Sequence, residues 1–448
     1  GMTILSRHLP YTSRLFARFS SSSTRLAVIG SGPSGLFSTA LLLRRLPWLS
    51  IDVLDASPVP FGLVRYGVAP DHQEVKNCIH VFEKMFESNR DRLSLFCNVR
   101  VGNGPKEVSV NELRSRYSAL LLAYGASRPR RLTVKGADAV NVLSGSEVVS
   151  WYSGSPSSHS SPLLDHPSAI VIGNGNVALD CARVLARKDS LAPFDIPEKA
   201  FKVLQESKVR EIFVVGRRGP ADVSFTIKEL REQFRMEGWS TGVKMEKEDE
   251  EHLRESLQSL PRPKKRLMQV LLENTREPVG DKRCTFLFRR SPSEVLSDDN
   301  GRVRSVVFDG PGGTKHEIPA GLVIASLGYQ SVVLDGLPRN DKGELAMADD
   351  TRVAVPGDGA RVYASGWCVR GAHGVIADSQ GAAQRVTAVM AGDLNEGADD
   401  RGIKDVLKSK GMKWTSWDDW VNIDAKEREE GERRGKIREK VVEFVENA

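Results

Sequence analysis

Two glycine-rich segments of the same form, at residues 30–35 and 173–178, constrain the fold of this chain more than any other feature. Each follows a short apolar run that is typical of a buried strand, at residues 26–29 and 169–172. Each precedes an apolar segment with helical spacing. A strand, a glycine-rich turn and a helix in this order are typical of Rossmann-like dinucleotide-binding units. The sequence therefore predicts an α/β fold with two such units.

The first unit lies in "RLAVIGSGPSGLFSTALLLRRL", where the Gly-x-Gly-x-x-Gly pattern is formed by Gly30, Gly32 and Gly35. The first glycine permits a tight turn, the second lets the backbone approach a pyrophosphate, and the third allows close helix packing. The predicted helix over residues 36–46 would bind the phosphates at its N-terminus. The next strand closes on Asp55, whose carboxylate can accept hydrogen bonds from ribose hydroxyls. A glycine turn alone also serves plain structure, but the complete pattern predicts a dinucleotide site.

The second unit has the turn "GNGNVA", in which Ala178 takes the place of the third glycine. After its helix, an insertion at residues 188–208 leads to the strand "REIFVV", which is followed by Gly216, Arg217 and Arg218. A carboxylate here would repel the 2′-phosphate of NADP, whereas guanidinium groups bind phosphate through charge-assisted hydrogen bonds. The second unit is therefore expected to bind NADP(H) and not NAD(H). The alternative is a pair of ordinary surface arginines.

Two dinucleotide sites in one chain imply electron transfer between two dinucleotides. The first site is expected to hold FAD, because a unit at the N-terminus that closes on an acid leaves its cofactor room to run the length of the domain. The five cysteines are scattered, at positions 78, 97, 181, 284 and 368, and form no Cys-x-x-Cys motif. This spacing predicts no metal or iron–sulfur site. It also lacks the paired cysteines that a flavin disulfide reductase needs.

Residues 1–23 differ in composition from the rest of the chain. They hold three arginines and many serines, and the first acid is Asp52. This composition is typical of a mitochondrial presequence, and a floppy tail is the alternative. Without this segment the formal net charge falls from +6 to +3, which is too mild to indicate nucleic-acid binding. No apolar run approaches the roughly 18 residues of a membrane span, so we expect a mitochondrial matrix protein with no transmembrane segment.

Several longer motifs carry a family resemblance. They are "PVPFGLVRYGVAPDHQEVKN" (58–77), "GNGNVALDCAR" (173–183), "GRRGPADVSFTIKELRE" (216–232), "PRPKKRL" (261–267) and "SGWCVRGAHGVI" (365–376). Their sequences and their order along the chain resemble those of the adrenodoxin reductase family. Members of this family are mitochondrial NADPH:ferredoxin reductases with a glutathione-reductase-like fold. The resemblance, which includes the C-terminal "WDDWVNIDAKEREEGERRGKIREK", covers nearly everything after residue 24. It implies hydride transfer from NADPH to FAD, followed by single-electron transfer to an acidic [2Fe–2S] ferredoxin of the adrenodoxin type.

The resemblance also implies residue roles. FAD contacts are expected at Ser34, Asp55, Leu63, Val101, Trp367, Gly374, Val375 and Ile376. NADP contacts are expected at Asn174, Gly175, Asn176, Val177, Arg217, Arg218, Glu229 and Gly374. Ferredoxin docking is expected at Arg231, Arg262 and Arg266, and the prolines of "PRPKKRL" are expected to hold that segment in a short exposed turn. The family usually has Pro-Thr where this chain has Ala372-His373, and Lys-Arg where it has Val369-Arg370.

Two further features concern the chemistry of the flavin. The run at residues 375–392 predicts a helix whose N-terminal N–H groups could stabilise a reduced, anionic flavin. His72, in "APDH", is the best titratable candidate for proton movement, and a capping or packing histidine is the alternative. The cofactors carry the remaining chemistry, so no nucleophile is needed.

The expected domain layout follows from the order of the motifs. Residues 24–127 and 328–448 should form the FAD domain, with the NADP domain, residues 128–327, inserted between them. Residues 245–252 are charged and are therefore expected to lie on the surface. The last 25 residues alternate charges at helical spacing, which predicts a solvated helix. The competing function is an NADPH-dependent flavin monooxygenase, which no sequence feature favours. A non-enzymatic NADPH-binding module does not explain the first unit. Peripheral association with the matrix side of the inner membrane is compatible with this interpretation.

Overall fold

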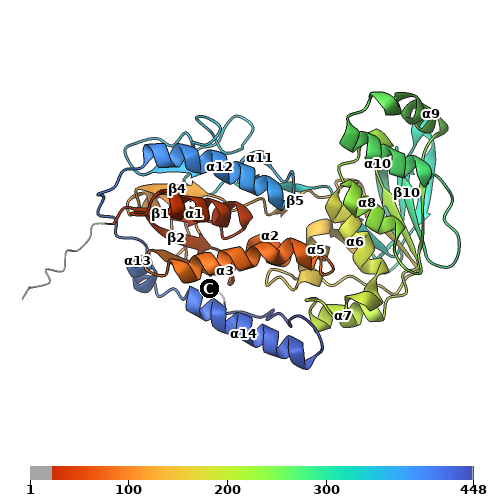
Figure 1. The fold of residues 1–448 in the computed structure, drawn as a ribbon. Coiled ribbons are helices and arrows are strands. Elements are labelled where there is room, and N and C mark those ends of the chain that lie inside the picture. The colour runs from red at the N-terminus through yellow and green to blue at the C-terminus, as the bar shows by residue number, and fades with distance from the viewer. Residues whose placement is uncertain (1–22, 446, 448) are drawn as a thin grey trace, which may run out of the picture.

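The computed structural model describes residues 23–445 and residue 447, so the expected presequence lies outside the described residues except for its last position. The chain forms two lobes, each built on a parallel sheet (Figure 1). The first lobe lies on the left of the view and contains both ends of the described chain. The second lobe, in yellow to cyan on the right, is made from the middle of the chain.

The first lobe contains a five-stranded sheet in the order β16-β4-β1-β2-β3. Its strands are β1 (Arg25–Ile29), β2 (Ser50–Asp55), β3 (Leu93–Cys97), β4 (Ala119–Leu122) and β16 (Arg361–Ala364). Every pairing is parallel, and nearly all side chains of these strands are buried. Burial on both faces is what such apolar strands require. The surrounding helices are α1 (Pro33–Arg45), α3 (Cys78–Ser88), α12 (Ile376–Asp393) and α14 (Trp417–Arg433).

The second lobe contains a six-stranded parallel sheet in the order β6-β14-β7-β8-β10-β9. Its strands are β6 (Val142–Ser144), β7 (Ser168–Ile172), β8 (Glu211–Val215), β9 (Ser240–Lys244), β10 (Arg283–Leu287) and β14 (Leu322–Ala325). The helices of this lobe are α5 (Gly145–Ser153), α6 (Asn176–Ala186), α7 (Glu198–Gln205), α8 (Ile227–Phe234), α9 (Lys247–Ser256) and α10 (Arg262–Glu273).

The other face of this sheet packs against a small antiparallel sheet through a shared apolar core. That sheet consists of β11 (Ser291–Ser297), β12 (Val303–Asp309) and β13 (Lys315–Pro319). The two segments of chain that cross between the lobes pair with each other as β5 (Arg128–Pro129) and β15 (Tyr329–Gln330). The remaining short helices are α2 (Gly62–Tyr66), α4 (Val110–Arg114), α11 (Trp367–Arg370) and α13 (Lys404–Ser409). The predicted α/β fold, with a second dinucleotide-binding type of unit inserted into the first, is confirmed.

Three local predictions were wrong or incomplete. Residues 261–267 form the start of helix α10 and not a short turn, because Pro263 occupies the first turn, where no intrahelical N–H is needed. The charged stretch at 245–252 enters helix α9 and buries Asp249, which pairs with Arg289 at 2.6 Å. The C-terminal helix ends at Arg433, and the chain beyond it runs back over the protein in an irregular path.

Among the described residues, no helix combines the length and the apolar character that crossing a membrane would require.

Candidate functional site: two dinucleotide-binding edges

The two glycine-rich turns occupy equivalent places at the carboxyl ends of the two sheets. In the first lobe, the Gly30 N–H donates to the Leu54 carbonyl across β1 and β2, at 2.7 Å. In the second lobe, the Gly173 N–H donates to the Val215 carbonyl across β7 and β8, at 2.9 Å. Asp55 and Gly216 follow those two carbonyls and therefore occupy corresponding positions. The carboxyl edge of such a sheet is where ligands of this fold class bind.

The glycines of the first turn have different physical requirements. Gly30 has φ +113°, and a Cβ there would lie 2.6 Å from the Ala123 carbonyl carbon and 2.9 Å from the Tyr124 Cα. Gly32 has ordinary extended backbone, and a Cβ there would meet no heavy atom within 4 Å. The backbone of Gly32 therefore faces open space, which is the space that a pyrophosphate would need. The fold requires glycine at position 30, because a side chain there would clash with the backbone. At position 32 the fold accepts a side chain, so glycine is required only if a ligand must approach the backbone.

Asp55 lies at the end of β2 and already accepts hydrogen bonds from the protein. Its carboxylate accepts from the Ser31 N–H at 2.7 Å, the Ser31 hydroxyl at 2.5 Å and the Ser57 N–H at 2.8 Å. Burial raises the pKa of Asp55, and the bonds from Ser31 and Ser57 oppose that rise. The carboxylate is thus oriented by the turn that it faces.

The other residues expected to contact FAD gather around the same turn. The Ser34 hydroxyl donates to the Ser365 hydroxyl at 3.3 Å, which brings the start of α1 to the end of β16. Leu63 lies in α2, which is anchored by the Phe61 N–H donating to the Ser31 carbonyl at 3.1 Å. The Trp367 indole N–H donates to the His373 carbonyl at 3.0 Å and so holds the 371–374 loop.

Two of the residues expected to contact FAD have large apolar side chains that are exposed to solvent. Leu63 is 41% exposed and Val375 is 47% exposed. An aromatic ring system bound over either side chain would remove it from water. Val101 is buried, in a short bridge with Val108, close to where the Val99 N–H donates to the Asp55 carbonyl. The residues present therefore fit a flavin dinucleotide.

Helix α12 confirms the predicted helix after Gly374, but the N–H of its N-cap residue, Val375, is not free. The Val375 N–H donates to the Asp378 carboxylate at 2.7 Å. An acid in the first turn already satisfies part of the positive helix end.

The second turn has an orphaned polar atom and two unpaired cations. The Asn174 side-chain oxygen is buried and has no hydrogen-bond partner among the described residues. Buried polar atoms are normally paired, so this oxygen indicates a missing partner. Arg217 and Arg218, just after β8, are exposed, and within 4.0 Å of them the described residues offer no carboxylate. These features fit a phosphorylated dinucleotide.

Glu229 and His72 lie in a buried cluster where the two lobes meet. Arg183 donates to Asp71 at 2.7 Å and to Glu229 at 3.2 Å, and it is fully buried. The His72 Nε2 lies 2.5 Å from a Glu232 oxygen, and its Nδ1 lies 3.9 Å from Glu229. This cluster joins the loop after α2 to helices α6 and α8 across the lobe boundary.

Several carboxylates of this cluster surround the Arg183 guanidinium. His72, Glu229 and Glu232 are spaced closely enough to hold a metal ion, but the Arg183 guanidinium supplies a positive charge beside both carboxylates. Burial, and secondarily the charge of Asp180, raises the pKa of Glu229. Asp71 is also buried, but hydrogen bonds and charge from Arg183 outweigh this and lower the pKa of Asp71. The sequence motifs contain Arg183 and Asp71, yet their pairing could not be read from them.

The expected docking residues lie on two adjacent helices of the second lobe. Arg231 is on α8, and Arg262 and Arg266 are in the first two turns of α10. All three are exposed, and among the described residues no acid pairs with them. Lys228, by contrast, is paired with Glu74 at 2.7 Å. Basic side chains are unfavourable at a helix N-terminus, so Arg262 and Arg266 lie where the helix dipole of α10 disfavours them.

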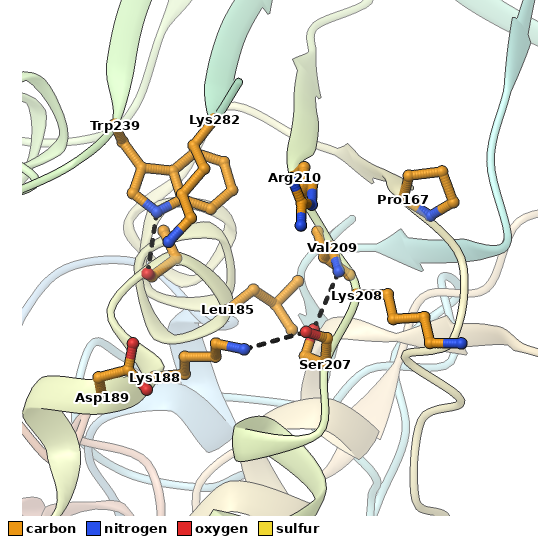
Figure 2. Close-up of a pocket in the computed structure, with 11 residues that line it drawn as sticks. Pro167, Leu185, Lys188, Asp189, Ser207, Lys208, Val209, Arg210, Trp239 and Lys282 are labelled. Atoms are coloured by element: carbon orange, nitrogen blue, oxygen red, sulfur yellow. Dashed lines mark hydrogen bonds between the residues drawn. The ribbon is translucent and has the colours of Figure 1, made fainter. Parts of the chain in front are cut away.

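A cavity of about 600 Å³ lies elsewhere, at the amino ends of β7, β8 and β10 (Figure 2). Two of its polar side chains donate hydrogen bonds to its own walls. The Lys188 ammonium donates to the Ser207 carbonyl at 2.9 Å, and the Trp239 indole N–H donates to the Ala186 carbonyl at 3.0 Å. Since both glycine-rich turns lie at the opposite edges, this cavity is separate from the dinucleotide sites.

Comparison with known proteins places these features in a family. A family model described as pyridine nucleotide-disulphide oxidoreductase matches residues 24–233. The protein named NADPH:adrenodoxin oxidoreductase, mitochondrial, from Salvelinus fontinalis is 38% identical over 95% of this chain and 90% of that protein. The protein of the same name from Homo sapiens is 37% identical over 94% of this chain and 90% of its own length.

The solved structures agree. The oxidoreductase FprA of Mycobacterium tuberculosis, in complex with NADPH, matches with a TM-score of 0.85 and 33% identity. That match covers 94% of this chain and 97% of FprA. The mitochondrial names of the relatives support the predicted mitochondrial location. This chain belongs to the family of mitochondrial NADPH:adrenodoxin oxidoreductases.

Proposed function

We propose that this protein takes a hydride from NADPH onto FAD and passes the electrons singly to an acidic [2Fe–2S] ferredoxin of the adrenodoxin type. The observation that carries this proposal is the correspondence of the two turns. In each lobe, the first glycine of the turn donates a hydrogen bond to the carbonyl at the end of the neighbouring strand. The residue after that carbonyl is Asp55 in the first lobe, and in the second lobe it is Gly216, followed by Arg217 and Arg218. One chain thus offers one edge suited to a ribose hydroxyl and one suited to a 2′-phosphate.

The domain layout follows from the two sheets. We propose an FAD domain at residues 24–127 and 328–448, and an NADP domain at 128–327. The β5–β15 ribbon, where both connections cross, supports these boundaries.

The residues at the first edge would hold FAD. Gly32 would let the pyrophosphate approach the backbone of a turn whose shape requires Gly30 and Gly35, with Ser34 beside it and Asp55 toward the ribose. Val101, close to Asp55, would lie toward the ribose, and the flavin end would be covered by Leu63, Trp367, Gly374, Val375 and Ile376. When bound, FAD supplies two-electron acceptance and single-electron release.

The residues at the second edge would hold NADPH. Asn174, Gly175, Asn176 and Val177 would contact the phosphates at the start of α6, where the orphaned Asn174 oxygen lies. Arg217 and Arg218 would bind the 2′-phosphate, and Glu229 and Gly374 would lie toward the nicotinamide. His72, held by Glu232, is the residue that we propose for proton movement.

The location and partner follow from the same proposal. We place the protein in the mitochondrial matrix or on the matrix face of the inner membrane, with residues 1–23 as presequence. Arg231, Arg262 and Arg266 would dock the ferredoxin, since they are exposed cations on neighbouring helices.

The direct test compares NADPH-driven reduction of cytochrome c with and without added ferredoxin. The proposal requires that the rate depend on ferredoxin. A flavin monooxygenase would instead consume oxygen and release peroxide or an oxygenated product whether or not ferredoxin is present. Strong peroxide release with no ferredoxin effect would contradict the proposal.

We refer to Arg231, Arg262 and Arg266 as the docking group. Reversing the charge of residues in this group should slow electron transfer to ferredoxin. In Arg262→Glu with Arg266→Glu, we expect a loss of roughly tenfold or more at low salt, about 1.4 kcal/mol. The wild-type rate should also fall as salt is raised, because the Debye length is about 10 Å at 0.1 M. Steady-state reduction of cytochrome c through ferredoxin measures both effects.

The control for this prediction is a second charge reversal of the same size. Lys342→Glu with Lys408→Glu changes two exposed lysines outside the docking group and should leave the rate nearly unchanged. NADPH reduction of ferricyanide should be unaffected in both variants. Equal loss with both acceptors would assign Arg262 and Arg266 to folding or to NADPH binding.

A further inference from the structure

The chain beyond α14 turns back and crosses its own helix. Residues 435–441, here named the C-terminal strap, start at Gly435, which has φ +71°. The Glu439 N–H donates to the Glu427 carbonyl, and the Val441 N–H donates to the Glu427 carboxylate, both at 2.9 Å. The strap passes directly over Gly431, where a Cβ would lie 2.7 Å from the Arg438 nitrogen. Only a glycine in α14 permits this close approach.

The strap contacts the insertion that follows α6 in the second lobe. The Ile437 N–H donates to the Pro193 carbonyl at 3.1 Å, and the Glu198 N–H donates to the Glu439 carboxylate at 2.9 Å. The Lys436 ammonium donates to the Ile196 carbonyl. Backbone and side chains of the strap therefore bind residues 193–198 at three points.

Lys440 lies at the centre of these contacts and is almost fully buried. Its ammonium donates to the Ser153 carbonyl at 2.9 Å and to the Arg65 carbonyl at 3.1 Å. It also lies 3.4 Å from the Asp195 carboxylate. One side chain thus joins the end of α5, helix α2 and the insertion.

Asp195 is the other half of this connection. It is buried and also accepts from the Lys76 ammonium at 2.6 Å and from the Gln73 side-chain amide at 3.0 Å. These two donors come from the first lobe, while Asp195 belongs to the second. The strap consequently strengthens an ionic contact between the lobes.

Burying the charged Lys440 side chain costs desolvation free energy. Burial, with a smaller contribution from the charge of Lys76, lowers the pKa of Lys440 to about 7 in spite of the opposing charge of Asp195. An apolar residue would fill the same space without this desolvation cost. The ammonium is therefore better explained by the three partners that it holds than by packing.

The strap connects the two helices that carry the expected cofactor contacts. Arg65, whose carbonyl Lys440 binds, lies in α2 with Leu63. The insertion begins directly after α6, whose first turn contains Asn176 and Val177. A change at the strap would therefore alter how the NADP-binding helix faces the FAD-binding lobe.

We propose that the C-terminal strap sets the relative orientation of the two lobes and that Lys440 is its central positioning residue. The consequence for hydride transfer rests on the function proposed above, whereas the tethering itself does not. Lys440 touches no cofactor-binding residue side chain and acts through α2 and the insertion.

The test uses the full chain with two variants that disturb the strap differently. Lys440→Met keeps the length and apolar stem of the side chain and removes its donors. Gly431→Ala removes no polar group but places a methyl group against the Arg438 backbone, while favouring helix in α14. Lys426→Met, at an exposed position on α14, is the matched control.

Hydrogen exchange at residues 193–198 and 435–441 is the first measurement. Both strap variants should exchange at least tenfold faster there, whereas the two sheets and the control variant should match wild type. The rate of flavin reduction by NADPH should fall fivefold or more, with NADPH affinity within twofold of wild type.

The outcomes separate the two proposals. Unchanged exchange at 193–198 in both strap variants would overturn the tether. Faster exchange with an unchanged rate of flavin reduction would overturn the positioning role. If wild type itself accepts no hydride from NADPH, the proposed function fails, and hydrogen exchange still decides whether the strap tethers the lobes.

Discussion

Replacing both Arg217 and Arg218 with alanine is expected to abolish the preference for NADPH over NADH. Each charge-assisted hydrogen bond to the 2′-phosphate contributes roughly 1.5–3 kcal/mol, so the loss of one weakens NADPH about 10- to 150-fold. The two guanidinium groups have no carboxylate partner among the described residues, so their removal breaks no internal ion pair. The ratio of kcat/KM for NADPH to that for NADH measures the effect.

The reason for the selectivity is the absence of the 2′-phosphate in NADH. The kcat/KM for NADH should stay nearly constant, because its ribose hydroxyl gains little from either arginine. Arg304→Ala, at an exposed arginine of the small antiparallel sheet, is the control and should change neither value. Equal losses with the two nucleotides would show that Arg217 and Arg218 do not contact the 2′-phosphate.

The variant Gly32→Val should fold and yet fail to bind FAD. Gly32 has φ −78° and ψ −175°, a conformation that valine adopts readily, and the space around its Cβ is open. The valine side chain would fill the place where the pyrophosphate must approach the backbone. Purified wild type should be yellow with non-covalent FAD, and the variant should be colourless.

The matched comparison is Gly30→Val, which should fail for a different reason. At Gly30, φ is +113° and the added carbon would meet the backbone of Ala123 and Tyr124. That variant should lose thermal stability even without cofactor, whereas Gly32→Val should melt like wild-type apoprotein. If Gly32→Val retained FAD at full occupancy, or if wild type could not be reconstituted with FAD, the two-site proposal would be wrong.

The parts of the structure that the sequence predicted well are those whose signals are local. A strand, a glycine turn and a helix fall within some 20 residues, so their periodicity and glycine spacing identify them together. The contrast between Asp55 and Arg217 is also local, because each follows a strand directly. For the same reason the helix after Gly374 was correctly predicted.

The parts that could not be predicted depend on distant partners. Alternating charge near the C-terminus favours a solvated helix. In the structure, Lys440 is buried and donates to the carbonyls of Ser153 and Arg65. Both partners lie far from Lys440 in the sequence, so no local pattern indicates these contacts. Gly431 and Gly435 were the available signals, since glycine is unfavourable inside a helix and glycine in the left-handed conformation commonly ends one. Residues 261–267 were misread because a proline starts a helix as readily as it stops one.

The place of β16 in the first sheet has a consequence for biosynthesis. β16 pairs with β4, so Ala119 meets Arg361 only after the whole second lobe has left the ribosome. At about 5–20 residues per second, translation of the roughly 240 intervening residues takes about 12–50 s. During that interval the β4 edge of the nascent N-terminal sheet lacks its neighbour, and an uncovered edge invites pairing with other chains. The lobe that begins first is therefore completed last.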